Sequence, residues 1–252
     1  MIRTAILIPY YNHPMGLART LSSLSHERED FTVYLVDDGN VPVLKITEQY
    51  PFPIRIVRLE KNSGIVAALN AGLKEILTGN FDYIARIDAG DHWITGRLAA
   101  QRDYLMTHPD AVWVSCRAIA MTTEGKELFT VNYPSSDTDI RRRMHLNSAC
   151  CHAGSMLCVS AVRKAGGYSA NYLAAEDYEF FWRLLKMGQG ANLPNVWLKY
   201  EVDETTPSIS IQKRRGQSAK PLLAASLRGV APEESRALGS AWRESRSLTR
   251  SV

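Results

Sequence analysis

Between residues 4 and 116 the chain alternates short apolar runs with amphipathic stretches, and this alternation narrows the folds open to it. Apolar runs of roughly four to eight residues bounded by turn residues are typical of buried strands. Apolar residues at helical spacing predict helices between them. The expected strands are 4–9, 31–36, 54–59, 83–87 and 111–116, and the expected helices are 14–25, 64–77 and 97–108. This order predicts an α/β fold with a parallel sheet and helices on both faces.

Two local signals refine this assignment. Pro14 suits the first turn of a helix, and Ser63 is an expected N-cap of the helix that follows it. Arg86 interrupts the apolar run that precedes Asp88, so the match of that run to a buried strand is imperfect.

The pattern is less regular after residue 120. We expect a turn at Gly125 between short strands, further strands at 155–159 and 193–200, and helices at 137–145, 161–165 and 176–187. From residue 211 onward the chain again favours helix. The expected organisation is therefore one domain over residues 1–210 and a basic helical C-terminal extension over residues 211–252.

Charge is unevenly distributed along the chain. The net charge is +4, which is too small to indicate a nucleic-acid partner. Residues 205–252 hold nine Lys or Arg and three Glu, a net charge of +6, which leaves −2 for residues 1–204. A basic segment on a near-neutral body indicates an anionic surface such as membrane headgroups as a partner. A solvated helix face is the alternative interpretation.

The cysteines and the apolar runs bear on cellular location. Cys116, Cys150, Cys151 and Cys158 show neither a disulfide framework nor a zinc-binding spacing, which is typical of free thiols in a reducing cytosol. No apolar run reaches the roughly 18 residues that a membrane span needs, and no signal peptide is evident. We therefore expect a cytoplasmic protein whose basic extension contacts the inner face of the cell membrane.

Polar residues follow three of the expected strands. Because the carboxyl ends of parallel strands share one edge of a sheet, these residues should meet where α/β proteins bind ligands. They are Tyr11 and Asn12, Asp37 and Asp38, and Asp88 and Asp91. The last pair, separated by a glycine that allows close backbone approach, suits a hard cation and a phosphate. The alternatives are a solvated turn for the last pair and a helix cap for Asp37 or Asp38 taken singly.

Five stretches together resemble the inverting glycosyltransferases of family 2, which have the GT-A fold. They are IPYYN at 8–12, VDDG at 36–39, NSGIVAALN at 62–70, IDAGD at 87–91 and AEDYEF at 175–180. Each stretch is weak alone, but their order and spacing are specific, and the resemblance covers about residues 4–210. It implies a Rossmann-like, mostly parallel central sheet with helices on both faces, followed here by the C-terminal helical segment.

The resemblance also implies a donor site. Pro9 and Tyr11 would lie against the base of a nucleotide-sugar, and Asp38 would accept a hydrogen bond from that base, usually from uracil N3–H. Asp88 and Asp91 would hold Mn²⁺ or Mg²⁺, although the family commonly has an acidic residue where this chain has Gly90. The implied donor-binding residues are Pro9, Tyr11, Asp38, Asn62, Gly64, Asn70, Asp88 and Ala89.

The same resemblance makes Asp177 the catalytic base and leaves Glu176, Trp182 and His152 as candidate acceptor or phosphate contacts. Such roles suit the reaction, since the diphosphate gains negative charge as the acceptor hydroxyl loses a proton. Each residue also has a plainer interpretation. Acidic residues are favoured in the first turn of any helix, and an aromatic residue at helical spacing or a lone histidine is commonly part of a core.

The expected function is that of a hexosyltransferase. It would move a sugar, from a UDP-sugar above all, to a hydroxyl of a glycan or lipid-linked acceptor in bacterial surface polysaccharide or lipopolysaccharide synthesis. Gly90 motivates one alternative, a non-catalytic nucleotide-sugar-binding protein. A dinucleotide-binding oxidoreductase is disfavoured, because the first strand is followed by PYYNH at 9–13 instead of a GxGxxG turn.

Overall fold

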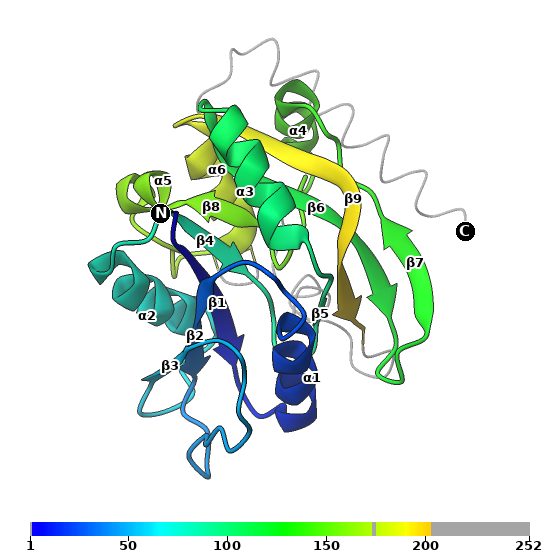
Figure 1. The fold of residues 1–252 in the computed structure, drawn as a ribbon. Coiled ribbons are helices and arrows are strands. Elements are labelled where there is room, and N and C mark those ends of the chain that lie inside the picture. The colour runs from blue at the N-terminus through cyan, green and yellow to red at the C-terminus, as the bar shows by residue number, and fades with distance from the viewer. Residues whose placement is uncertain (1, 173–174, 203–252) are drawn as a thin grey trace.

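The computed structural model describes residues 2–172 and 175–202, and all structural statements below refer to them (Figure 1). The expected extension over residues 211–252 and the domain boundary at residue 210 lie outside this part of the chain. In order, the elements are β1 (Thr4–Tyr10), α1 (Pro14–Leu24), β2 (Phe31–Asp37), β3 (Ile54–Arg58), α2 (Ile65–Thr78), β4 (Tyr83–Arg86), β5 (His92–Trp93), α3 (Arg97–Thr107), β6 (Ala111–Met121), β7 (Glu127–Val131), α4 (Asp137–Met144), β8 (Met156–Cys158), α5 (Val159–Ala165), α6 (Glu176–Leu185) and β9 (Gln189–Glu201).

The strands form one mixed sheet in the order β3-β2-β1-β4-β8-β6-β9-β5, with β7 paired to β6. Strands β3, β2, β1 and β4 are mutually parallel, and β9 is parallel to β6. Strand β8 runs antiparallel to both β4 and β6, so β4 and β6 point the same way. Strands β5 and β7 run antiparallel to β9 and β6. The predicted parallel sheet is confirmed for β3, β2, β1 and β4, and β8 adds an antiparallel strand that the sequence pattern did not indicate. A three-residue strand carries too little pattern to reveal its partners.

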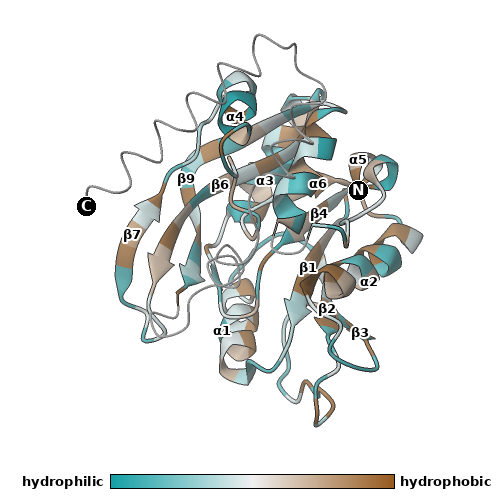
Figure 2. Cartoon of the chain, turned by 180° about the vertical axis from the view of Figure 1, so that it is seen from behind, coloured by the Kyte–Doolittle hydropathy of each residue, from teal (hydrophilic) through white to brown (hydrophobic). Residues whose placement is uncertain are grey.

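The core lies on both faces of this sheet. Successive residues of β1 point to opposite sides, so that Ala5 and Leu7 join one apolar cluster while Ile6 and Ile8 join the other. Helices α2, α4, α5 and α6 contribute to the first cluster, and α1 and α3 contribute to the second. Figure 2 shows the hydrophobic central strands between these helices. The prediction of helices on both faces is therefore confirmed.

Helix α2 begins differently from the expectation. Its N-cap residue is Gly64, with a φ of 85°, and the Ser63 hydroxyl donates a hydrogen bond to the carbonyl of Lys61 instead of capping the helix. The Asp38 carboxylate instead accepts hydrogen bonds from the backbone N–H groups of Ser63 and Gly64. The helix start is therefore fixed by a residue that directly follows β2, 25 residues before Ser63, and local sequence signals do not reveal such a contact.

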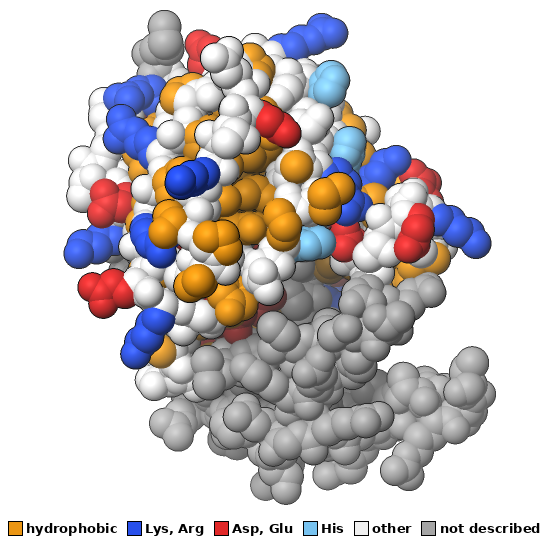
Figure 3. Space-filling view, turned by 90° about the horizontal axis from the view of Figure 1, so that it is seen from below, with side chains coloured by type: hydrophobic (Ala, Val, Ile, Leu, Met, Phe, Trp, Pro, Cys, Tyr) orange, Lys and Arg blue, Asp and Glu red, His pale blue; other side chains and the backbone are white. Residues whose placement is uncertain are grey.

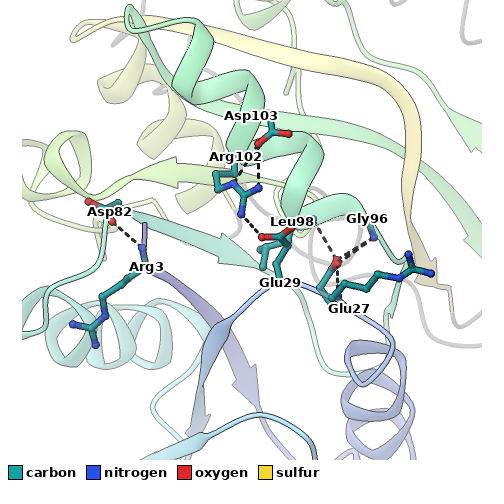
Figure 4. A network of polar contacts seen from close by, with 9 residues as sticks. Arg3, Glu27, Glu29, Asp82, Gly96, Leu98, Arg102 and Asp103 are labelled. Carbon is teal, nitrogen blue, oxygen red and sulfur yellow. Dashed lines mark hydrogen bonds and ion pairs between the residues drawn. The ribbon is translucent and has the colours of Figure 1, made fainter. Parts of the chain in front are cut away.

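A polar network fixes the segment between β5 and α3 (Figure 4). The Glu27 carboxylate accepts hydrogen bonds from the Trp93 indole N–H at 2.9 Å and from the backbone N–H groups of Gly96 and Leu98. These acceptors satisfy donors at the start of α3, which has no capping side chain of its own. Glu27 thereby holds the end of the segment that leads from β4 through β5 into α3.

No helix within residues 2–172 and 175–202 is long and apolar enough to cross a membrane.

Candidate active site

The carboxyl ends of β1, β2 and β4 meet at one edge of the sheet. Tyr10 is in register with Asp37, and Leu7 is in register with Arg86, so the loops that follow these strands leave the sheet side by side. Two groups from later in the chain, Tyr168 before α6 and Asp177 in the first turn of α6, raise the pKa of Arg86 at this edge. The polar residues singled out in the sequence are thus gathered from distant parts of the chain.

Arg86 lies at the centre of this edge, and the sequence reasoning did not select it. Its side chain is only 4% exposed, and it donates hydrogen bonds from Nη2 to Asp88 Oδ1 at 2.7 Å and from Nη1 to Asp88 Oδ2 at 3.2 Å. Burial lowers the pKa of Arg86, but the charges of Asp88, Tyr168, Asp177 and Asp91 raise it above the ordinary value. A charged residue inside an apolar strand was the signal available in the sequence, because a buried charge needs a partner.

Asp88 and Asp91 lie in different environments. The Asp88 side chain is 42% exposed, whereas Asp91 is buried, and its Oδ1 accepts a hydrogen bond from the backbone N–H of Glu201 at 3.2 Å. Burial, and then the charge of Asp88, raise the pKa of Asp91 well above its usual range. Of the two carboxylates, Asp88 is therefore the one readily presented to a ligand.

Gly90 has a backbone that suits glycine. Its φ is 113°, in the region that other residues rarely adopt, and its N–H donates a hydrogen bond to Thr20 Oγ1 at 3.0 Å. A Cβ at this position would lie 3.1 Å from His13 Nε2. An acidic residue at position 90 would therefore be strained in this loop.

The described residues offer few side-chain ligands for a divalent cation. Within the described ranges no group of three or more His, Cys, Asp or Glu side chains could hold a metal ion. Mg²⁺, however, commonly uses one or two carboxylates and completes its shell with water and substrate phosphates. The half-exposed carboxylate of Asp88 fits that pattern, with the buried Asp91 close behind it.

Asp37 and Asp38 both stabilise the loops around them. Asp38 accepts hydrogen bonds from the backbone N–H groups of Ser63 at 2.7 Å and of Gly64 at 2.9 Å. The Asp37 carboxylate accepts from the backbone N–H of Asn40 at 2.9 Å and pairs with Arg58 at 3.1 Å. A carboxylate has about four lone-pair sites, so Asp38 retains capacity to accept one more donor.

The other residues expected at the donor differ in exposure. Tyr11 is 52% exposed and Asn62 is exposed, whereas Pro9 is buried within β1. Ala89 is partly buried against the second core cluster, and Gly64 leaves open space beside its Cα. Figure 3 views the side toward which β1 and β2 point in Figure 1, and shows hydrophobic side chains gathered in the middle of the described surface.

Asn70 holds the segment that precedes α6. Its amide donates a hydrogen bond to the Tyr168 carbonyl and accepts one from the Tyr168 N–H, both at 2.8 Å. The Tyr168 hydroxyl in turn lies 2.7 Å from His152 Nε2. Burial, and then the charge of Arg86, lower the pKa of His152 well below its ordinary value, so this histidine is neutral. Asn70 thus holds the backbone of Tyr168, whose hydroxyl contacts His152.

Asp177 occupies the first turn of α6. Its Oδ1 accepts a hydrogen bond from the backbone N–H of Tyr178 at 2.7 Å. Burial raises the pKa of Asp177, while that N–H group and the charge of Arg86 oppose the increase. Glu176 precedes it in the same turn. Trp182 lies one turn further on and packs edge-on against His145, with ring centroids 5.1 Å apart, which agrees with its plainer interpretation as a packing residue.

Comparison with known proteins gives a consistent result. Residues 5–166 match the family described as glycosyl transferase family 2. The amylovoran biosynthesis glycosyltransferase AmsE from Erwinia amylovora is 31% identical over 220 residues, which cover 84% of this chain and 79% of AmsE.

Solved structures share the fold. Residues 1–349 of S. aureus TarS, crystallised with UDP-GlcNAc, superpose with a TM-score of 0.63 at 15% identity over 81% of this chain and 59% of that one. The mannosyltransferase PcManGT from Pyrobaculum calidifontis, in complex with GDP-Man and Mn²⁺, gives a TM-score of 0.57 at 15% identity over 99% of this chain and 76% of its own. The chain therefore belongs to glycosyl transferase family 2 and is a glycosyltransferase with the GT-A fold.

Proposed function

We propose that this enzyme transfers a sugar from a nucleotide-diphosphate donor, a UDP-sugar above all, to a hydroxyl of a glycan or lipid-linked acceptor, with inversion at the anomeric carbon. The observation that carries the proposal is the Asp88 carboxylate, which the buried Arg86 holds at the sheet edge where the carboxyl ends of β1 and β2 also lie. The complexes of TarS with UDP-GlcNAc and of PcManGT with GDP-Man support donors of this class. The name of AmsE, an amylovoran biosynthesis glycosyltransferase, supports a role in bacterial polysaccharide synthesis.

The donor is proposed to bind across the ends of β1 and β2. The exposed ring of Tyr11 offers a surface on which a planar base can stack, with Pro9 below it in β1. Asp38 would accept a hydrogen bond from the base with its remaining lone pairs. The loop at Asn62 and Gly64 and the residues Asp88 and Ala89 would border the diphosphate and sugar, with Asn70 acting through Tyr168.

Asp88, supported by Asp91, would hold Mn²⁺ or Mg²⁺. When bound, such an ion stabilises the charge that develops on the diphosphate leaving group. The protein's own contribution is to orient the Asp88 carboxylate, which both Nη atoms of Arg86 fix.

Asp177 is proposed to take the proton of the acceptor hydroxyl as that oxygen attacks the anomeric carbon. The bond from the anomeric carbon to the diphosphate oxygen breaks on the opposite face, which inverts the sugar. Glu176, Trp182 and the neutral His152 are candidate contacts for the acceptor or phosphate. A positioned carboxylate base accelerates such a step by about 10²- to 10⁴-fold.

A screen of nucleotide-sugars tests the proposal. UDP- and GDP-sugars should be hydrolysed slowly to free sugar when Mn²⁺ or Mg²⁺ is supplied, and a bound donor should raise the melting temperature. A ligand at about 100 times its Kd adds roughly 2.7 kcal/mol to stability. Donor binding without any turnover would favour the alternative of a non-catalytic nucleotide-sugar-binding protein, which Gly90 and the buried Asp91 motivate. The family assignment removes the oxidoreductase alternative.

The two acidic residues of the loop after β4 should differ in their effect on metal-dependent binding. We expect Mn²⁺ to tighten donor binding in calorimetry, Asp88→Asn to abolish that gain, and Asp91→Asn to reduce it less, because Asp91 is buried and hydrogen-bonded to the backbone of β9. An equal gain in wild type and Asp88→Asn would contradict the assignment of the metal to Asp88. EDTA should lower turnover in the wild type.

The extension over residues 211–252 is proposed to contact anionic lipid at the cytoplasmic face of the membrane, next to a lipid-linked acceptor. Truncation after residue 210 should reduce binding to anionic vesicles far more than binding to neutral vesicles. Each Lys or Arg near such a surface contributes about 1 kcal/mol, and added salt should screen it. Equal binding of the full-length and truncated proteins in vesicle co-sedimentation would support the solvated-helix alternative.

A further inference from the structure

The buried face of α1, which lies beside β5 (Figure 1), carries a threonine whose hydroxyl reaches the loop after β4. Thr20 is fully buried on the same helix face as the core residues Leu17 and Leu21. A buried hydroxyl is costly unless it is hydrogen-bonded, and a helical threonine commonly bonds a carbonyl of its own helix. The Thr20 hydroxyl instead bonds the loop of residues 88–91. A valine would fill the same space, so packing alone gives no reason for this hydroxyl.

Thr20 Oγ1 contacts the 88–91 loop at three backbone groups. It accepts a hydrogen bond from the Gly90 N–H at 3.0 Å and donates one to the Asp91 carbonyl at 2.7 Å. The Asp88 carbonyl lies 3.3 Å from the same oxygen. The loop is also closed on itself, because the Asp91 N–H donates a hydrogen bond to the Asp88 carbonyl at 3.1 Å. A single side chain of α1 therefore fixes the path of the backbone between the two carboxylates.

A second connection runs from the same helix through β9. Arg19 Nη1 pairs with Glu201 Oε2 at 2.9 Å, and the backbone N–H of Glu201 donates a hydrogen bond to Asp91 Oδ1 at 3.2 Å. Helix α1 also approaches the loop so closely that a Cβ at Gly16 would lie 2.9 Å from Gly90 Cα. Helix α1 thus holds the loop both directly and through the end of β9.

We propose that Thr20 is a positioning residue for the donor's cation: its hydroxyl, supported by the Arg19–Glu201 pair, holds the 88–91 loop in the shape that presents the Asp88 carboxylate. This inference rests on the proposed role of Asp88 as a metal ligand. Gly90 leaves the middle of the loop free to adopt many conformations, so the loop depends on outside contacts for its shape. Thr20 is buried and acts through the loop backbone, without touching the cation.

Three variants separate this role from a purely structural one. Thr20→Val keeps the shape of the side chain and removes the hydroxyl, whereas Thr20→Ser keeps the hydroxyl and should behave like the wild type. Ser23→Ala is the matched control. The buried Ser23 hydroxyl, in the next turn of α1, accepts a hydrogen bond from the Trp93 N–H at 2.9 Å, so it holds β5 instead of the loop. Thr20→Val and Ser23→Ala each lose a buried hydrogen bond and should lower the melting temperature by similar amounts.

Amide hydrogen exchange in the protein without donor or metal tests the contact itself. The Gly90 N–H should be protected in the wild type, in Thr20→Ser and in Ser23→Ala. It should exchange about tenfold faster in Thr20→Val, because it loses its acceptor. Rapid exchange of Gly90 in the wild type, or unchanged exchange in Thr20→Val, would overturn the proposal.

Calorimetry of UDP-sugar binding over a range of Mn²⁺ concentrations tests what the contact does. Loss of a group that orients a metal ligand commonly lowers metal affinity by about 10- to 100-fold. The Mn²⁺ concentration that gives half of the gain in donor affinity should therefore be about tenfold higher in Thr20→Val. It should stay at the wild-type value in Thr20→Ser and Ser23→Ala, and donor affinity without Mn²⁺ should be the same in all four proteins.

The outcomes separate this inference from the proposed function. An unchanged Mn²⁺ requirement in a folded Thr20→Val, or an equal rise in Ser23→Ala, would overturn the role of Thr20 alone. No gain from Mn²⁺ in the wild type would refute the metal assignment to Asp88 and this inference together. Arg19→Met removes the second connection at a side chain that is 30% exposed, so it should fold, and it should raise the Mn²⁺ requirement less. An unchanged requirement in Arg19→Met would overturn the proposal where Thr20→Val does not fold.

Discussion

Replacing Asp177 with Asn is expected to lower the turnover number for sugar transfer by about 10²- to 10⁴-fold and to leave donor affinity nearly unchanged. The amide keeps the shape of the side chain but cannot take a proton from the acceptor hydroxyl. The lost interaction belongs to the transition state, so calorimetry should show a donor Kd close to that of the wild type. Near-normal turnover in Asp177→Asn would remove Asp177 as the base.

Folding gives an internal control for this variant. The pKa of Asp177 is raised in the folded protein, so ionising it at neutral pH costs folding free energy, and that cost disappears as the pH falls below the folded pKa. Asn does not ionise. The Asp177→Asn protein should therefore melt at the same temperature as the wild type or slightly higher at neutral pH, with a smaller difference in acid.

Glu176→Gln is the matched comparison. Glu176 occupies the same first turn of α6, but successive residues point about 100° apart around a helix. It should therefore lower turnover much less than Asp177→Asn. The wild-type turnover profile should also fall on the acid side at a pH above the ordinary aspartate range, because burial raises the pKa of Asp177. Similar losses in both variants would indicate a general disturbance of the turn.

Gly39→Ala is expected to cost about 2–6 kcal/mol of folding free energy and to weaken donor binding. The φ of Gly39 is 70°, and a Cβ there would lie 2.1 Å from the backbone carbonyl carbon of Lys61. Left-handed backbone strain contributes about 1–3 kcal/mol, and forced displacement of a packed neighbour contributes about as much. That displacement would pull the loop at residues 61–64 away from the Asp38 carboxylate that holds it.

Gly125→Ala is the control for Gly39→Ala. Its φ of 86° is similar, but a Cβ there would meet nothing within 4 Å, and the turn lies between β6 and β7. It should lose only the strain contribution of about 1–3 kcal/mol. Chemical denaturation of both variants measures the difference. Equal losses would show that the approach of Gly39 to Lys61 is unimportant for the loop.

The sequence predicted the parts of the fold that periodicity encodes. The strand–helix alternation through residue 116 gave the helices on both faces and the shared edge after β1, β2 and β4. The insertion of β8 between β4 and β6 could not be predicted, because β8 is three residues long and pairs with strands more than 40 residues away in the chain. Pairing at that separation depends on the packed core and not on a local pattern.

The sequence predicted which residues occur at the candidate site better than it predicted what each of them contacts. Motifs show which residue types occur, but not which backbone groups those side chains already bind. Asp38 and Asn70 were selected as donor contacts, and the structure shows both holding loops through two hydrogen bonds each. Arg86 was noted only as an imperfection of a strand, although the cost of burying its charge pointed to a partner such as Asp88.

The anomer released from an α-linked UDP-sugar tests the central claim most directly. In the presence of Mn²⁺, ¹H NMR coupling constants recorded before the free sugar equilibrates report which anomer forms first. Attack on the face opposite the diphosphate, with Asp177 as base, predicts that the β-anomer appears first. First appearance of the α-anomer, or no consumption of any nucleotide-sugar donor, would contradict the account.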